Sequence, residues 1–370
     1  SSFTIGSNLA ATSALVIDTT APTVTGVDSS TDAGTYIAGQ SISIQVTFSE
    51  TVNVTGTPQL TLETGGTDAV VDYASGSGSS VLTFTYTVGS NQTSSDLDYA
   101  STTALALNGG TIKDVGGNNA TLTLATPGEA GSLAANEALV IDTTAPSINA
   151  IATSALSWGD VLNATEDNSD GTVTVTTVGV EDGQTLTITL NSATYTASVS
   201  SNSATVTITA SGLQALTSGQ TYTLTADVSD AAGNAAAQVT SSSFTVDTTA
   251  PSINAIGTGA LSWGDVLNAT EDNADGTVTV TTVGVEDGQA VTITLNSATY
   301  TANVSSNSAT VTITASGLQA LTSGQTYTLT ADVSDAAGNA AAQVTSSSFT
   351  VDTTAPTITS VTSTTNDGTY

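Results

Sequence analysis

The sequence predicts an all-β chain of tandem antiparallel β-sandwiches arranged as a linear rod. Apolar and polar residues alternate with a period of two over most of the chain, which is typical of strands that bury one face. The pentapeptide Asp-Thr-Thr-Ala-Pro also recurs, at spacings of 124, 105 and 105 residues, each the size of a small domain. It occupies Asp18–Pro22, Asp142–Pro146, Asp247–Pro251 and Asp352–Pro356.

The repeats divide the chain into five expected segments. These are residues 1–17, the tail of a preceding long-type module; 18–141, a long-type sandwich; 142–246 and 247–351, two short-type sandwiches; and 352–370, the start of a further long-type module. The last segment is assigned because residues 357–370 echo residues 23–36. The two short modules differ at only six positions. Near-identical copies suit a protein whose function is length or valency better than an enzyme with one active site.

The expected strands follow the alternating runs. In the long module these include residues 42–48 and 82–88, and in the first short module residues 173–180, 186–190, 206–210 and 222–228. Apolar positions change phase across Thr176 and Thr177, which predicts a β-bulge there. No helix of useful length is expected. About seven strands per module, separated by Gly, Asn, Asp and Ser turns, indicate immunoglobulin-like connections.

Two kinds of aromatic position have alternative interpretations. Tyr222 follows Leu-Thr-Ser-Gly-Gln-Thr, which is typical of a tyrosine corner but also fits an ordinary core tyrosine. Trp158 and Trp263, in the repeated motif Ser-Trp-Gly-Asp, suit core or edge packing, with sugar stacking as the alternative.

The charge balance limits the partners. The chain has 32 acidic residues, a single basic residue (Lys113) and no histidine. Nucleic acid and anionic membranes are excluded because binding them needs patches of lysine or arginine. No apolar run is long enough to insert into a membrane. A metal cation is the expected partner, and the absence of cysteine and methionine suits an extracellular location.

Acidic side chains from distant parts of the sequence are expected to meet at the junctions between modules. If strands alternate in direction, the turn after the second strand and the Asp-Ala-Ala-Gly-Asn turn lie beside the linker that enters a module. The loop before the second strand lies at the opposite end, beside the next linker. The candidate ligands are Asp18, Glu50, Asp114 and Asn118 at the first junction; Asp142, Glu181, Asp182, Asp230 and Asn234 at the second; Asp247, Glu286, Asp287, Asp335 and Asn339, faced by Glu166 and Asp167, at the third; and Asp352 with Glu271 and Asp272 at the fourth.

Calcium is the ion that this inventory fits, because it takes six to eight oxygen ligands and needs neither nitrogen nor sulfur. The alternative is that these are solvated turn residues, since Asp-x-x-Gly-Asn makes a good turn without a metal. Convergence of three loops on a repeated aspartate favours calcium. The linker adds stiffness of its own, because proline fixes its φ angle and holds the preceding alanine extended. The expected object is stiff with calcium, and looser and more sensitive to protease without it.

The short-module segments GVEDGQTLTITLNSATYTASV, ASGLQALTSGQTYTLTADVSDAAGNAA and FTVDTTAP resemble the bacterial immunoglobulin-like extender repeats of giant repeats-in-toxin adhesins. The long module, with FSETVNVTG and LNGGTIKDVGGNNATLTL, is similar to a related repeat of very large bacterial surface proteins. The resemblance implies a calcium-rigidified stalk, exported by type I secretion, that holds a terminal binding domain away from the cell. The family's linker calcium sites would fall on Asp142, Asp230, Asp247 and Asp335.

The expected function is therefore a non-catalytic stalk segment at the bacterial cell surface whose partners are calcium and neighbouring modules. An enzyme is disfavoured, because only a carboxylate pair remains for acid–base work and the paired acids lie in the repeated junction loops. The alternative is a subunit of a self-assembling extracellular filament, sheath or surface layer, for which threonine-rich faces would pack laterally. Lateral self-association stays open at this stage.

Overall fold

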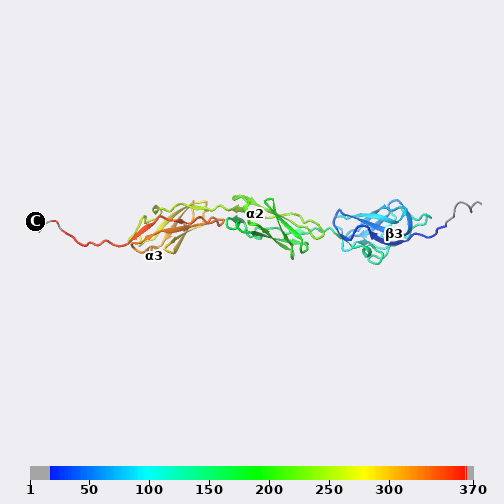
Figure 1. Ribbon diagram of the computed structural model, residues 1–370, viewed down its shortest axis with the longest axis horizontal. Helices are drawn as coiled ribbons and strands as arrows, with labels where there is room; N and C mark the ends of the chain where they lie inside the picture. The colour runs from blue at the N-terminus through cyan, green and yellow to red at the C-terminus, as the bar shows by residue number, and fades with distance from the viewer. Residues whose placement is uncertain (1–16, 363, 365–370) are drawn as a thin grey trace, which may run out of the picture.

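The computed structural model describes residues 17–362 and 364, and it arranges them as three β-sandwiches that follow one another in a line (Figure 1). We call them the first sandwich (Val24–Asp142), the second sandwich (Ser147–Asp247) and the third sandwich (Ser252–Asp352). Each has its own cluster of buried apolar residues, and the three clusters share no member. The chain is therefore all-β, as predicted, with a separate core in each sandwich.

The first sandwich contains one large and one small sheet. The large sheet has the order β1-β3-β6-β5-β4-β8, with β10 paired to β3 and β9 paired to β4, and the small sheet has the order β2-β11-β7. The elements are β1 (Val24–Ser29), β2 (Gly34–Tyr36), β3 (Ser41–Thr55), β4 (Gln59–Glu63), β5 (Ala69–Ser75), β6 (Ser79–Thr87), β7 (Thr93–Ser94), β8 (Asp98–Tyr99), β9 (Leu105–Ala106), β10 (Thr111–Lys113), α1 (Leu133–Asn136) and β11 (Leu139–Asp142).

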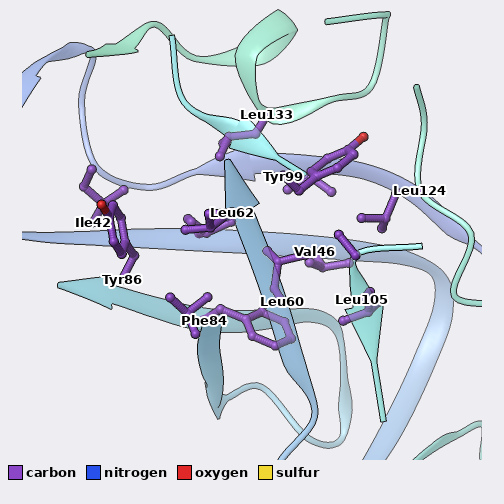
Figure 2. Packing of buried hydrophobic residues seen from close by; sticks show 14 of the residues in the cluster. Ile42, Val46, Leu60, Leu62, Phe84, Tyr86, Tyr99, Leu105, Leu124 and Leu133 are labelled. Atoms are coloured by element: carbon purple, nitrogen blue, oxygen red, sulfur yellow. The ribbon is translucent and has the colours of Figure 1, made fainter. Parts of the chain in front are cut away.

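The core of the first sandwich follows the predicted alternation. Ile42, Ile44 and Val46 on β3 pair with Tyr86, Phe84 and Leu82 on β6, and all six are buried. Figure 2 shows Leu60 and Leu62 of β4 among the side chains of β3 and β6. Because aromatic residues make up only 4% of the chain, aliphatic side chains supply most of the buried area, and burial of that area is the main stabilising contribution.

The second and third sandwiches have the same topology. Each contains a sheet formed by the first, third and sixth strands, a second sheet of three strands and a third sheet of four: β12-β14-β17, β13-β21-β18 and β16-β15-β19-β20, then β22-β24-β27, β23-β31-β28 and β26-β25-β29-β30. The elements of the second sandwich are β12 (Ser147–Ile148), η1 (Thr153–Ala155), β13 (Val161–Asn163), β14 (Gly171–Val178), β15 (Thr185–Leu190), β16 (Ala193–Ser198), β17 (Ser203–Ile208), α2 (Ala210–Gln214), β18 (Thr221–Tyr222), β19 (Leu224–Asp227), β20 (Val239–Thr240) and β21 (Phe244–Asp247). Those of the third are β22 (Ser252–Ile253), η2 (Thr258–Ala260), β23 (Val266–Asn268), β24 (Gly276–Val283), β25 (Ala290–Leu295), β26 (Ala298–Asn303), β27 (Ser308–Ile313), α3 (Ala315–Gln319), β28 (Thr326–Tyr327), β29 (Leu329–Asp332), β30 (Val344–Thr345) and β31 (Phe349–Asp352).

One strand pair in each sandwich is parallel, although the sheets are otherwise antiparallel. β13 runs parallel to β21, β23 to β31 and β2 to β11. The chain first pairs through β12 with β14 and then crosses to the opposite sheet as β13. Because β13 and the last strand both run toward the next linker, this crossing places Asn163 directly beside Asp247.

Two expectations about the strands are wrong. β14 pairs with β17 without a register shift, so Thr176 and Thr177 form no bulge. Thr177 is buried and Val178 is 58% exposed; the phase changes only after Val178, where Gly179 has a φ of 76° and returns Val180 to the core. Ala210 also continues no strand, because the Thr209 side chain accepts a hydrogen bond from Gly212 N and caps the short helix α2.

The tyrosine corner is confirmed, and the tryptophans are core residues. The Tyr222 hydroxyl accepts a hydrogen bond of 3.0 Å from Thr217 N, and Tyr327 repeats the contact with Thr322 N at 2.9 Å. Trp158 is 5% exposed and meets Phe244 edge to face, with ring centroids 5.4 Å apart. A buried indole offers no face to a sugar, so the stacking alternative for Trp158 is wrong.

Candidate junction sites

Each sandwich has an Asp-x-x-Gly-Asn loop of the same structure, and the loop lies at the end of the sandwich where the linker enters. In the third sandwich the Asp335 Oδ1 atom accepts a hydrogen bond from Asn339 N at 2.8 Å, and Asp335 Oδ2 accepts one from Asn339 Nδ2 at 2.9 Å. Asp230 with Asn234, and Asp114 with Asn118, repeat both contacts. The loop aspartate is therefore buried and held in one orientation by its own turn.

The asparagine of this loop also binds the linker. Its Nδ2 atom donates to the backbone carbonyl oxygen of the linker aspartate at all three junctions: Asn118 to Asp18 at 3.1 Å, Asn234 to Asp142 at 3.1 Å and Asn339 to Asp247 at 2.9 Å. The predicted meeting of the linker and the Asp-x-x-Gly-Asn loop is confirmed by these bonds. Two oxygen atoms, the linker carbonyl and the loop carboxylate, thus face a single amide group.

The first junction brings three carboxylates together. Asp18, Glu50 and Asp114 each offer an oxygen atom, and these atoms lie within 4.8 Å of one another. Within the part of the chain that the structure describes, no other group of three acidic side chains lies this close together. Three carboxylate oxygens this close together, with no nitrogen or sulfur among them, suit a calcium ion.

The pKa shifts at this junction reflect the crowding of charge. Burial, followed by the negative charges of Asp18 and Asp114, raises the pKa of the Glu50 carboxyl. Burial also opposes ionisation of Asp114, but hydrogen bonds from the Asn118 side chain and from backbone N–H groups outweigh it and lower the pKa of that carboxyl. Glu50 is thus the group that a nearby cation would relieve most.

The second and third junctions divide their predicted acids between two turns. The Glu181 carboxylate accepts a hydrogen bond of 2.8 Å from Ala231 N, in the Asp-Ala-Ala-Gly-Asn loop, and Glu286 does the same with Ala336 N. The Asp182 carboxylate instead accepts from Ser201 N at 2.6 Å, in the turn between β16 and β17, and Asp287 repeats this with Ser306 N. Glu181 and Glu286 therefore contact the loop, whereas Asp182 and Asp287 are engaged by a different turn.

The acids at the opposite end of each short sandwich lie beside the next linker. The Glu166 carboxylate accepts from Asn163 N at 3.1 Å, and Glu271 does the same with Asn268 N. Asp167 and Asp272 lie in the corresponding turns, where their backbone N–H groups donate to the carbonyl oxygens of Asn163 and Asn268. The linker aspartates Asp142, Asp247 and Asp352 each accept a hydrogen bond from the backbone N–H two residues later.

Residues that the sequence analysis did not single out also hold the third junction. Asn163 Nδ2 donates to the Ala337 carbonyl oxygen at 3.0 Å, and Ala164 N donates to Asn339 Oδ1 at 2.8 Å, both across the boundary between sandwiches. The Ser218 hydroxyl accepts from Thr248 N in the linker at 3.1 Å. The sequence offered no signal for these residues, because nearly all of the short module is repeated and repetition therefore singles out no position.

No family model and no curated protein matches the chain by sequence. Similar solved structures include one concerned with host cell surface retention of a 1.5-MDa bacterial ice-binding adhesin, 23% identical over 89% of this chain and 98% of that one, with a TM-score of 0.40. Another is a Ca²⁺-stabilized adhesin with which an Antarctic bacterium binds ice, 26% identical over 90% of this chain and 75% of that one (TM-score 0.41). A third is an immunoglobulin-like domain of the M. primoryensis ice-binding adhesin, 32% identical over 28% of this chain and 95% of that one (TM-score 0.21).

None of the described helices has the length and apolar character that a membrane span requires.

Proposed function

We propose that this chain is a non-catalytic stalk segment of a large bacterial surface adhesin, stiffened by calcium at the junctions between its sandwiches. The observation that carries the proposal is the repeated bond from the Asp-x-x-Gly-Asn loop to the linker aspartate. At the second and third junctions that bond ties the linker aspartate, which ends the last strand of the preceding sandwich, to the sandwich that follows. An ion bound there would join the same elements more strongly.

The proposed ligands are carboxylates and backbone oxygens. At the first junction Asp18, Glu50 and Asp114 would hold the ion. At the second and third, the linker aspartate, the loop aspartate and Glu181 or Glu286 would do so after small side-chain movements, with acids of the preceding sandwich completing the third site. A bound divalent cation would offset the mutual repulsion of these carboxylates and, by binding only the folded junction, would stabilise it. Outside the cell, where calcium is abundant, such a segment would keep a terminal binding domain at a distance.

The proposal is tested by following the full chain in solution while calcium is added. Small-angle scattering gives the maximum dimension and the mass, and calorimetry gives the melting temperature. We expect calcium to lengthen and stiffen a monomer and to raise its melting temperature. A gain in mass would indicate lateral assembly into a filament instead. An unchanged dimension and melting temperature at millimolar calcium would contradict the calcium part of the proposal.

A matched pair of variants locates the effect. Asp335→Asn removes one charge from the loop at the third junction. Asp332→Asn removes one charge from β29 of the same sandwich, where the carboxylate contacts only Gln343 among its hydrogen-bond partners in the described chain. We expect the first variant to weaken the calcium response and the second to leave it unchanged. Equal responses would show that the ion does not bind at the junction.

A further inference from the structure

We propose that each short sandwich carries, at its C-terminal end, a latch that docks the Asp-x-x-Gly-Asn loop of the sandwich that follows, and that this latch works without a metal. In the second sandwich the latch consists of Val161, Asn163 and Ala164. In the third it consists of the identical residues Val266, Asn268 and Ala269. The inference deepens the proposed stalk function, because the latch would stiffen a junction that calcium also stiffens.

Two hydrogen bonds form the latch at the third junction. Asn163 Nδ2 donates to Ala337 O at 3.0 Å, and Ala164 N donates to Asn339 Oδ1 at 2.8 Å. The Asn339 amide uses its other end for Asp335 Oδ2 and for the linker carbonyl of Asp247, both at 2.9 Å. One buried amide, 3% exposed, therefore joins the preceding sandwich, the linker and its own loop. Water competes poorly for hydrogen bonds in such a buried place, so these bonds hold the geometry firmly.

The near-identity of the two short sandwiches supplies an internal control. Val161, Asn163 and Ala164 are only partly exposed, because the third sandwich covers them. Their counterparts in the third sandwich are exposed, and Val266 has 45% of its surface accessible. The same asymmetry appears on the other side of the junction, where Asn339 is buried and its counterpart Asn234 is only partly so. Since the residues are identical, docking accounts for the difference in burial.

The latch is already shaped where no sandwich covers it. Asn268 Oδ1 accepts hydrogen bonds from Thr270 N at 2.9 Å and from Glu271 N at 3.2 Å. Asn163 Oδ1 makes the same two bonds, at 2.9 and 3.0 Å. Because Oδ1 accepts both bonds of this turn, the Nδ2 atom takes no part in it in either copy. A preorganised donor loses little conformational entropy on docking, so the third sandwich presents a ready surface for the Asp-x-x-Gly-Asn loop of a further sandwich.

The second junction is built differently, because the first sandwich is of the long type. There the linker itself is tied to the preceding sandwich: Asp142 pairs with Thr93 between β11 and β7, and the Thr143 hydroxyl donates to Gln92 O at 2.9 Å. Apart from the bond from Asn234 Nδ2 to Asp142 O, no hydrogen bond within the described residues runs from the first sandwich to the Asp230–Asn234 loop. The type of the preceding sandwich therefore decides whether a junction has a latch.

The test measures the spread of distances across the third junction in the full chain. Because the chain has no cysteine, Thr194→Cys and Thr299→Cys introduce two defined labelling sites, both exposed and at equivalent positions of the second and third sandwiches. Spin labels there report the distance distribution by electron double resonance. The test variant is Asn163→Asp, which keeps the Oδ1 acceptor for the turn but replaces the Nδ2 donor with an oxygen that repels Ala337 O. The control is Asn268→Asp, which makes the same change where no following sandwich lies among the described residues.

In EDTA we expect Asn163→Asp to broaden the distance distribution and Asn268→Asp to leave it as in the parent. Equal widths for the two variants in EDTA would overturn the latch. Melting curves of both variants establish that the sandwiches remain folded. Calcium is then added as a separate arm. If calcium narrows the distribution of Asn163→Asp, the latch and the metal act independently and both proposals stand; if calcium changes neither parent nor variant, the proposed calcium stiffening fails while the latch stands.

Discussion

The side-chain amide nitrogen of Asn118 donates a hydrogen bond to the backbone carbonyl oxygen of Asp18, one hundred residues earlier in the chain, at 3.1 Å. Asn234 and Asn339 form the same bond with Asp142 and Asp247 over 92 residues. Asp142 and Asp247 are also the last residues of β11 and β21, so each bond ties the end of one sandwich directly to a loop of the next. Small changes at this contact would therefore alter the bending of the whole chain.

Asn339→Ala should destabilise the third sandwich by about 1–3 kcal/mol, because it leaves the buried Asp335 Oδ2 atom and the carbonyl oxygen of Asp247 without the Asn339 Nδ2 donor. Chemical denaturation in EDTA checks this. Trp158→Phe in the background makes Trp263 the only tryptophan, so its fluorescence reports the third sandwich alone. Asn254→Ala is the control: among the described residues the Asn254 side chain bonds only to the Thr281 hydroxyl, at an exposed position, and a loss of less than about 0.5 kcal/mol is expected there. Equal losses of stability in the two variants would show that the buried Asn339 amide does not stabilise the sandwich.

Glu50→Gln should change the stability of the first sandwich in opposite directions with and without calcium. The raised pKa of Glu50 means that its ionised form is disfavoured in the folded state, so its contribution to stability falls as pH rises through the folded pKa. At neutral pH in EDTA the variant removes that repulsion and should raise the melting temperature. In calcium it removes a ligand and should reduce the stabilisation. A shift of the same sign in both conditions would argue against an ion at this junction.

Alkaline pH should destabilise the first sandwich between about pH 10 and pH 12. Burial raises the pKa of Tyr86 to about 12, and burial, followed by the charge of Asp98, raises the pKa of Tyr99 to about 12. Both hydroxyls donate hydrogen bonds of 2.8 Å, to Gln92 Oε1 and to Ala125 O. Below their ordinary pKa of 10.0 these two tyrosines are protonated in both the folded and the unfolded state, so they make no pH-dependent contribution there; above it the unfolded chain ionises first and stability falls.

The measurement for this alkaline transition is denaturant unfolding followed by circular dichroism at several pH values. Tyr86→Phe should lower stability at neutral pH and flatten the decline above pH 10, because one titrating group is gone. An unchanged slope in the variant would show that Tyr86 does not titrate with unfolding.

Gly276→Ala should destabilise the third sandwich by about 1–3 kcal/mol through overpacking. A Cβ atom at this position would lie 2.6 Å from Trp263 Cζ3 and 3.0 Å from Leu318 Cδ1, both in the core. Gly259→Ala is the control: nothing lies within 4 Å of its added Cβ, and the second sandwich has Ser154 there. We expect the control to be neutral or slightly stabilising. The shift in the denaturation midpoint measures the loss of stability in each variant. Comparable losses of stability in Gly276→Ala and Gly259→Ala would contradict the packing argument.

The alternation of apolar residues correctly indicated which side chains of β3, β6, β15 and β19 are buried, because a strand has only two faces and the pattern states which one is apolar. The same reasoning failed at Thr177. There β14 continues in phase for two residues more than the apolar pattern suggests, since its pairing with β12 holds a threonine inward and leaves Val178 outside. A threonine methyl can fill a core position, so residue polarity alone does not locate the end of a strand.

Among the junction residues, too, the sequence pattern located some contacts and missed others. The repeated Asp-x-x-Gly-Asn and Asp-Thr-Thr-Ala-Pro motifs, together with strand direction, predicted that Asp114, Asp230 and Asp335 would meet the linkers. They did not indicate that Asp182 would bond to Ser201 N, because the path of the turn between β16 and β17 is set by packing.

By itself the sequence determined the tandem β architecture, the burial of most apolar positions and the acidic character of the junctions, because these depend on local periodicity, repetition and composition. The tertiary structure alone decided which acids share a junction and that Asn163 crosses to Ala337, 174 residues later. The physical reason is that a hydrogen bond needs its two atoms about 3 Å apart in the right direction. That condition depends on how two separately folded sandwiches dock, and no pattern within either one contains it.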